Sequence, residues 1–468
     1  MKNRIKQYLL AASMCVGLTA CSDFFEPIPG VQFGLDETFA SKQRTEEYLN
    51  NVYSYVREVT DAIHPNTYGG IFTEASLDGA NRWNKTYAEW TNGSFNSASA
   101  QASEYFSKYY QAIAKASTFI QNVDKCTEAA ASTRGKWKSE ARALRAYYYF
   151  ELLRLYGPIP LIGEDPIPLD ASLEELIKER NSVDECVNFI ATELQSAIDS
   201  GDLLQRAGKA NLGRMDVATC MALKAKLYLY WASPLFNGNT DQASVKNKDG
   251  KQLFPQTEDN SKWAQARDAY ERFMTFATGQ GYKLTEVYTN GKLDPYASCR
   301  AAGEFFTSPV LRLADMYLGY AEALCMCSDL DNALTYLNKI RVRAGIPEYT
   351  FTATAGKITC PKTQTDLLNR IRRERLVELV FEWNRYFDVR RWKVAEGQND
   401  PEHWIYPAYH TGGEGGKVYG MNMDKDYPAF FERTSFETRV AFTKKQYFMP
   451  IPYDDLRRIP LLVQNLGW

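Results

Sequence analysis

The chain has 468 residues, of which 45% are hydrophobic and 24% are charged, and its formal net charge is −2. A chain of this length can bury a large core without disulfides or metal ions to stabilise it, and the length allows two or three lobes. The near-neutral charge balance, with no basic stripe, excludes nucleic acid as the main partner.

The first residues have the pattern of a bacterial export signal. Lys2, Arg4 and Lys6 precede a mostly apolar run from Tyr8 to Thr19. The run is too short to span a bilayer, and no other segment approaches the roughly 20 continuous apolar residues that a membrane helix needs. We therefore predict a signal peptide over residues 1–20.

The apolar run ends in Leu18-Thr19-Ala20-Cys21, which resembles the lipobox of bacterial lipoproteins. This motif predicts that Cys21 is acylated and becomes the first mature residue; an ordinary cleavage site beside an incidental cysteine is the alternative. The several acyl chains of a lipoprotein anchor it stably, whereas a single chain does not. Residues 21–40, which include two prolines, are predicted to be a lipidated N-terminal tether.

Apolar residues recur at spacings of three and four through much of the chain, which predicts a mainly helical protein. The expected helices cover residues 45–59, 103–123, 136–156, 183–200, 216–235, 263–277, 309–327, 331–344 and 366–393. Three of them share the pattern Ala-x-x-Tyr-[Phe/Leu], which begins at Ala146, Ala225 and Ala314. A small residue one turn before a large aromatic residue favours close packing between the adjacent helices of a repeat.

The segment 366–393 combines apolar and charged residues more densely than any other. Its apolar residues are expected to form one stripe of a single helix: Leu368, Ile371, Leu376, Leu379, Val380 and Trp383. Glu374, Glu378 and Glu382 are four residues apart, as paired catalytic carboxylates could be. Each has an arginine three or four positions away, and no nucleophile or metal ligand lies nearby, so we predict a structural ion-pair network instead.

The stretch from Arg373 to Trp392 is similar to the signature helix of the SusD/RagB family, the glycan-capturing surface lipoproteins of Bacteroidota. Further blocks resemble the family in the same order, at residues 141–162, 221–238, 311–324, 333–347 and 447–456. The resemblance implies a mainly α fold, in which tetratricopeptide-like helix pairs form the scaffold and long loop insertions carry the function. It also implies an N-terminal SusD-like helical region at 41–260 and a C-terminal SusD/RagB region at 261–468.

The resemblance further implies a binding protein rather than an enzyme, held by its lipid on the outer membrane and exposed at the cell surface. Its expected partners are an oligosaccharide or polysaccharide and a SusC-like TonB-dependent transporter that receives the glycan. Asp23 and Glu26, close behind Cys21, are similar to the acidic residues that accompany surface export in the family.

The loops between the helices hold many of the aromatic residues, which make up 13% of the chain. Sugar rings stack on aromatic planes, while their hydroxyls bond to Asn, Asp, Arg and Lys. Anchoring of each loop to the scaffold is the alternative role for a single ring. Because the family builds its site from the loop after the first helix and from a later insertion, we predict that glycan contacts come from Asp78, Asn81, Arg82, Trp83, Trp90 and Tyr296.

Other chemistry is weakly indicated. The seven cysteines after Cys21 are odd in number and irregular in spacing, so buried thiols are predicted rather than a disulfide framework or a zinc site. Asn247, Asp249, Glu258 and Asp259 lack the ordered alternation of a calcium loop, and no metal or cofactor is expected. The glycine-rich residues 412–416 are not followed by a lysine-serine pair and are expected to be a flexible loop.

Two other classes of function stay open at this stage. A structural or adhesion protein, whose loops bind protein or peptide, would show no affinity for any glycan. A glycoside hydrolase or esterase would release product, although the sequence contains no H-E-x-x-H or G-x-S-x-G motif and its loops offer no convincing acid and base pair.

Overall fold

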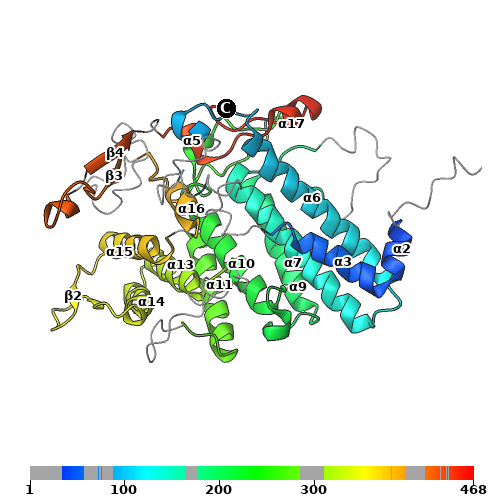
Figure 1. Cartoon of the computed structure of the whole chain (residues 1–468), viewed down its shortest axis with the longest axis horizontal. Helices are drawn as coiled ribbons and strands as arrows, with labels where there is room; N and C mark the ends of the chain where they lie inside the picture. The colour runs from blue at the N-terminus through cyan, green and yellow to red at the C-terminus, as the bar shows by residue number, and fades with distance from the viewer. Residues whose placement is uncertain are drawn as a thin grey trace, which may run out of the picture.

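The computed structural model describes residues 34–56, 72, 75, 88–163, 178–284, 310–380, 382–396, 417–432, 434–438, 440 and 442–468. Helices dominate these residues (Figure 1). The longer helices are α3 (Lys42–Tyr53), α6 (Ala100–Asn122), α7 (Ala131–Tyr156), α9 (Val183–Asp199), α10 (Val217–Ala232), α11 (Ser261–Gly279), α13 (Leu313–Met326), α14 (Leu330–Arg343), α15 (Gln364–Glu378) and α16 (Asn384–Arg391). The shorter ones are α2 (Leu35–Ala40), α5 (Ala88–Asn92) and α17 (Tyr453–Arg458).

Successive helices pack on one another along the chain. The main contacts run from α6 to α7, then to α9, α10, α11, α13 and α14, and α15 returns to α13 (Figure 1). The small residues of the shared pattern, Ala146, Ala225 and Ala314, are almost completely buried, as close packing requires. The predicted mainly α scaffold of tetratricopeptide-like helix pairs is therefore confirmed.

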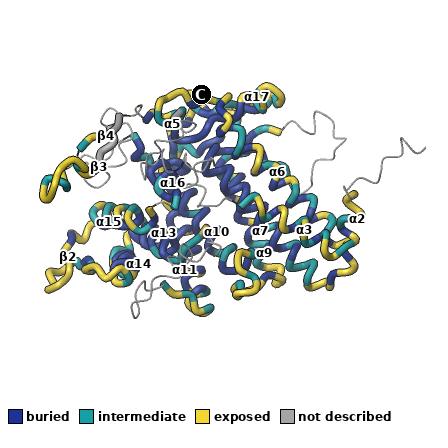
Figure 2. The backbone as a smooth tube through the Cα atoms, viewed as in Figure 1, coloured by how far each residue is buried: buried dark blue, intermediate teal, exposed yellow. Residues whose placement is uncertain are grey.

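Two apolar clusters form the core. The first extends from Phe39 near the start of the described chain to Leu462 near its end, and it includes α6, α7, α9 and α16. The second lies among α10, α11, α13, α14 and α15. Buried residues follow α7 and the inner faces of α10 and α13, while exposed residues gather on the outer helices such as α2 (Figure 2).

The predicted tether is too long at its C-terminal end. Residues 35–40 form α2, and Phe39 on this helix is fully buried. Its ring lies 5.3 Å from that of Tyr48 and 5.7 Å from that of Phe119. A side chain packed in this way fixes the segment to the scaffold, so the folded body begins before residue 41. Cys21 and the rest of the tether lie outside the described residues.

The predicted single helix over 366–393 is wrong, since the structure divides it into α15 and α16. Leu379 ends α15, and Trp383 precedes α16 with a φ of 63°, in the left-handed region. Ile371 on α15 packs in the second apolar cluster, whereas Trp383 and Tyr386 pack in the first. Because the chain turns between α15 and α16, this one segment contributes residues to both apolar clusters. Val380, which belongs to the expected stripe, is 40% exposed.

Strands are few and short among the described residues. β1 (Tyr349–Thr350) pairs in parallel with β2 (Ile358–Thr359). β3 (Lys417–Gly420) pairs antiparallel with β4 (Thr434–Thr438), with an irregularity in register between Val418 and Tyr419. In Figure 1 the β3–β4 hairpin stands away from the stacked helices.

The cysteine prediction is confirmed for the six cysteines after Cys21 that the structure describes. All six are free thiols, and only Cys327 is partly exposed. Burial raises the pKa of the Cys186 and Cys325 thiols to about 12, which suits unreactive core residues. Cys299 lies outside the described residues.

No helix in the described part of the chain is both long and apolar enough to cross a membrane. Within the same residues, no cluster of three or more His, Cys, Asp or Glu side chains could hold a metal ion. Asn247, one of the residues weighed for calcium, instead donates a hydrogen bond of 2.8 Å to the backbone oxygen of Arg180.

Candidate functional site

A chain of buried charges holds α16 against the scaffold. Its three cations and three anions alternate in the order Lys226, Asp315, Arg375, Asp388, Arg391, Glu322. The joining distances between nitrogen and oxygen run from 2.7 to 2.9 Å, and every side chain is at most 7% exposed. The indole Nε1 of Trp392 also donates to Glu322, at 2.7 Å. This network joins α10, α13, α15 and α16, so the position of α16 is strongly determined.

The network lowers the pKa values of Asp315 and Glu322, which favours their charged forms. Burial opposes ionisation of Asp315, but Lys226 and Arg375 beside it outweigh that effect and hold its pKa well below the usual range. Burial likewise opposes ionisation of Glu322, and Arg391 holds the pKa of that carboxyl below its usual value. Asp315 and Glu322 are therefore ionised at neutral pH.

These shifts predict acid sensitivity of the fold. A lowered carboxyl pKa in the folded state means that the unfolded chain takes up protons first, near pH 4, so stability falls as the pH drops below that point. Burial raises the pKa of Glu140, Glu382 and Asp455, so protonation of these three groups stabilises the fold as the pH falls toward about 4. Below that pH their contribution no longer changes and does not offset the loss from Asp315 and Glu322. Urea unfolding between pH 4 and pH 2.5 should show a falling free energy of unfolding. A constant or rising value would contradict this account of Asp315 and Glu322.

The three predicted glutamates are ion-paired, and their partners come from other helices or segments. Glu374 pairs with Arg341 of α14 at 2.7 Å. Arg312, just before α13, binds Glu378 at 3.1 Å and Glu382 at 2.6 Å. The predicted ion-pair network is confirmed, but local i,i+4 spacing did not identify these partners.

Aromatic residues of α16 anchor both ends of the loop that holds Asp78, Asn81, Arg82 and Trp83. Before the loop, Phe72 packs on Trp383, Tyr386 and Phe387, with ring centroids 5.2, 4.9 and 5.7 Å away. After the loop, the ring of Trp90 lies 6.3 Å from that of Tyr386. One side chain, Tyr386, thus contacts both roots of the loop.

Trp90 itself is a core residue, which corrects its prediction as a glycan contact. Its side chain is only 5% exposed. The rings of Phe95 and Trp468 lie 4.7 and 6.4 Å from it, and the Arg390 guanidinium lies 5.5 Å from its centroid. A sugar cannot stack on a ring whose faces already contact protein, so Trp90 acts as the loop anchor.

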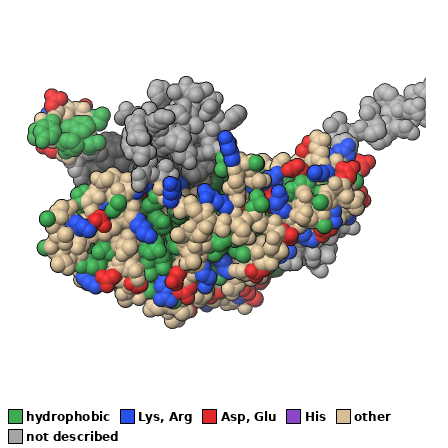
Figure 3. All heavy atoms as spheres, turned by 90° about the horizontal axis from the view of Figure 1, so that it is seen from below, with side chains coloured by type: hydrophobic (Ala, Val, Ile, Leu, Met, Phe, Trp, Pro, Cys, Tyr) green, Lys and Arg blue, Asp and Glu red, His purple; other side chains and the backbone are tan. Residues whose placement is uncertain are grey.

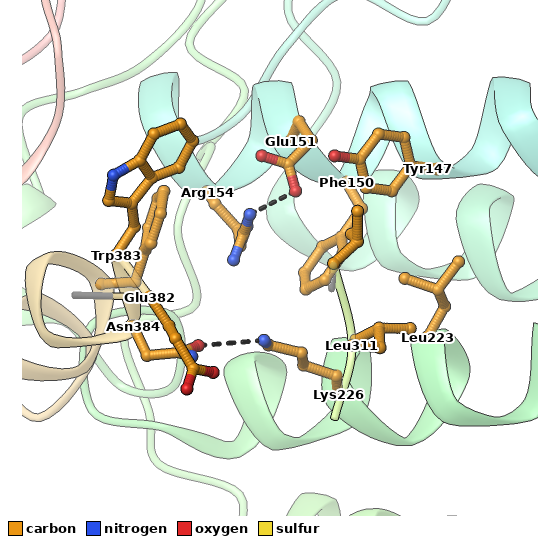
Figure 4. A pocket seen from close by; sticks show the side chains of 12 residues that line it. Tyr147, Phe150, Glu151, Arg154, Leu223, Lys226, Leu311, Glu382, Trp383 and Asn384 are labelled. Atoms are coloured by element: carbon orange, nitrogen blue, oxygen red, sulfur yellow. Dashed lines mark hydrogen bonds and ion pairs between the residues drawn. The ribbon is translucent and has the colours of Figure 1, made fainter. Parts of the chain in front are cut away.

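The residues that follow a second undescribed segment, 285–309, lie near the same helix. Val310 and Leu311, which follow the segment containing Tyr296, line a small cavity together with Glu382, Trp383 and Asn384 (Figure 4). Phe72 also contacts Trp383. Phe72, which precedes the segment with Trp83, and Val310, which follows the segment with Tyr296, therefore both lie near Trp383 at the beginning of α16.

The cavity does not have the properties of an active site. Glu151 and Glu382 both line it, but Glu151 is paired with Arg154 (Figure 4). Glu382 is paired with Arg312. Lys226 on the opposite wall donates to Asn384 at 3.1 Å. The free volume of about 30 Å³ holds one or two water molecules and no sugar ring. A pair of carboxylates acting on a glycosidic bond would need room for substrate between them.

The remaining predicted glycan contacts, Asp78, Asn81, Arg82, Trp83 and Tyr296, lie outside the described residues. The structure adds Phe72, Trp383 and Tyr386, which pack together next to the ends of these segments. The apolar pair Ile71-Phe72 in an otherwise largely polar stretch was the available signal for Phe72. Nothing local in the sequence indicates the left-handed backbone at Trp383.

Two family models match the chain, and together they cover almost all of the described residues. A model described as the SusD family matches residues 235–468, and one described as starch-binding associating with outer membrane matches residues 32–229. The chain belongs to the SusD family. A SusD-like protein of Bacteroides ovatus is 24% identical to this SusD-family chain over 82% of it and 85% of the relative.

Solved structures of the same fold cover nearly the full length of this SusD-family protein. A SusD-like protein from Bacteroides fragilis has a TM-score of 0.61 at 18% identity and covers 93% of this chain and 100% of its own. Surface glycan-binding protein A from Bacteroides uniformis has a TM-score of 0.57 at 17% identity, with 91% and 99% covered. At these identities the matches establish a shared fold.

Proposed function

We propose that this SusD-family protein binds glycans without cleaving them and delivers them to a SusC-like TonB-dependent transporter of the outer membrane. The observation that carries the proposal is the convergence of two loop roots on α16. Phe72 and Trp90, which flank the segment with Trp83, both contact Tyr386, and Val310, which follows the segment with Tyr296, lines a cavity together with Trp383. Loops rooted side by side on a rigid helix can present their side chains to one ligand.

The chemistry of the two loops supports a sugar ligand. Trp83 and Tyr296 offer planar apolar surfaces for the C–H faces of sugar rings, and Asp78, Asn81 and Arg82 offer hydrogen-bond partners for hydroxyls. The shared fold with a protein named for surface glycan binding supports the same ligand class.

Trp83→Ala is expected to weaken glycan binding at least fivefold without changing stability. A lost stacking surface is worth on the order of 1 kcal/mol or more, and 1.4 kcal/mol is a factor of ten. Isothermal titration calorimetry with an oligosaccharide that the parent binds measures the effect, and a denaturant titration checks the fold. Equal affinities for the parent, Trp83→Ala and Tyr296→Ala would remove both loops from the site.

The lipid anchor is part of the proposal and has its own test. The leader and the motif ending in Cys21 support attachment to the outer membrane. Cys21→Ser is expected to leave a folded protein that no longer sediments with membranes from cells without the transporter, because the proposed anchor is the lipid alone. Membrane association equal to that of the parent in such cells would contradict the anchor at Cys21.

A further inference from the structure

A pocket opens between the C-terminal end of α11 and the helices α13 and α14, which pack side by side (Figure 1). Its free volume is about 610 Å³, within the range of roughly 300–1,000 Å³ that is common for small-molecule sites. The described residues that line it come from these three helices and from the segments that follow α11 and α14. None of them lines the small cavity beside α16, so this is a second hollow with its own chemistry.

Four charged side chains line the pocket, and two of them are neutralised by partners. Glu348 pairs with Lys357 at 2.8 Å, and Arg343 pairs with a glutamate of α15. Lys283 and Lys339 form no ion pair with any residue that the structure describes. The lining therefore has an excess of two positive charges, which comes from these two lysines.

The excess persists when the charges around the pocket are included. The ion pairs that lead outward from the lining add two cations and two anions, which are Lys357, Arg312, Glu378 and Glu382. Beside the tyrosine rings, Arg206 lies 4.3 Å from the ring centroid of Tyr282, and Glu271 lies near Tyr336. These two charges also cancel, so the pocket keeps a net charge of +2 and favours an anionic ligand.

Two tyrosine rings hold the ammonium group of Lys339. Its Nζ lies 4.3 Å from the ring centroid of Tyr336 and 5.2 Å from that of Tyr317, and the two rings pack edge-on with centroids 5.6 Å apart. Such cation–π contacts attract an ammonium group without neutralising its charge. Lys339 is therefore held at the wall of the pocket while its charge stays available to an anion.

The uncharged part of the lining suits a sugar. Thr278 and Thr335 are exposed and offer hydroxyl groups, which both donate and accept hydrogen bonds. Leu284 and Val342, the latter 60% exposed, offer apolar surface for the C–H groups of a sugar ring. Figure 3 shows Lys and Arg side chains beside hydrophobic ones across the face of the molecule that is seen from below.

We propose that this pocket binds an acidic sugar residue of an oligosaccharide, a uronate, and that Lys283 and Lys339 pair with its carboxylate. The inference rests on the proposed glycan function, which supplies the sugar, and it adds the charge of the ligand and a second place of contact. Hydrogen bonds between an ammonium group and a carboxylate are roughly twice as strong as neutral ones. The two lysines therefore favour an acidic sugar over a neutral sugar of the same shape.

Isothermal titration calorimetry of the Cys21→Ser chain with trisaccharides of galacturonate, glucuronate and mannuronate tests the proposal. Each acid is compared with its methyl ester, which keeps the ring and removes the charge. At least one acid is expected to bind about tenfold more tightly than its ester, and its affinity should fall as the salt concentration rises. The double variant Lys283→Gln/Lys339→Gln is expected to bind that acid about tenfold more weakly than the parent.

Lys248→Gln is the matched control for the lysine variants. Lys248 is exposed, and its loop is held by the ion pair of Lys251 with Glu185. This loop lies near the N-terminal end of α11, where Lys262 pairs with Asp184, whereas the pocket lies at the C-terminal end. The control should bind the acid like the parent, and urea unfolding should give all variants the same midpoint, because all three lysines are exposed.

Three results would overturn the proposal. The first is equal affinity for each acid and its ester, and the second is parental affinity of the double variant for the acid. The third is displacement of the acid by an equal concentration of inorganic phosphate, which would make the pocket a site for any small anion. Binding of a neutral oligosaccharide that depends on Trp83, with no acid bound, would overturn this inference alone. Binding of no oligosaccharide, acidic or neutral, would overturn the proposed glycan function as well.

Discussion

Replacing Arg375 with Ala is expected to lower the free energy of unfolding by about 3–5 kcal/mol, the cost of stranding buried charge. The Arg375 guanidinium pairs with Asp388 at 2.9 Å and with Asp315 at 2.8 Å, and its side chain is 2% exposed. Both carboxylates, whose side chains are only 4% exposed, would lose a partner. Urea unfolding at pH 7 measures the change.

Lys108→Ala is the control for this experiment. Lys108 also forms an ion pair on a helix, with Glu104, but its side chain is 58% exposed. Exposed pairs contribute little, so this variant should stay within about 0.5 kcal/mol of the parent. If Arg375→Ala unfolded like Lys108→Ala and yet failed to bind glycan, the α15–α16 segment would have a functional role instead of the structural one.

Replacing Trp90 with Ala is expected to destabilise the fold by a similar amount, about 3–5 kcal/mol, as large-to-small substitutions of buried tryptophan do. The ring of Trp90 fills the space among Phe95, Tyr386 and Trp468. Its removal leaves a cavity and frees the end of the loop that holds Trp83. Thermal and urea unfolding both report the loss.

Trp83→Ala is the matched comparison, because both substitutions remove an indole from the same loop region. We expect Trp83→Ala to unfold like the parent but to bind glycan more weakly. We expect Trp90→Ala to be less stable than the parent. A Trp90→Ala protein as stable as the parent but unable to bind glycan would return Trp90 to the list of contacts and contradict its assignment to the core.

The helices could be predicted from the sequence because their apolar period is local. The pattern at Ala146, Ala225 and Ala314 depends on residues within one turn, and all three are almost completely buried at helix contacts. The break between α15 and α16 could not be predicted in this way. The apolar spacing continues through Leu379 and Trp383, and only the position of the two core clusters makes the chain turn.

The candidate site was harder to predict because long-range contacts decide which rings are exposed. Trp90 and Trp83 have similar polar surroundings in the sequence. Trp90 is buried because residues distant in sequence, among them Tyr386 and Trp468, pack beside it. The partners of Glu374 and Glu378 are likewise distant, at Arg341 and Arg312, so the sequence indicated pairing but not the pairs.

The central claim is that this SusD-family protein holds a glycan without cleaving it, and a glycan array with the lipid-free Cys21→Ser chain tests it most directly. We expect the chain to retain at least one class of oligosaccharide and the Trp83→Ala variant to retain less of it. The bound sugar should be recovered at its original length. Retention of no glycan while the chain still co-purifies with the transporter would contradict glycan binding, and recovery of shortened sugars would contradict the absence of catalysis.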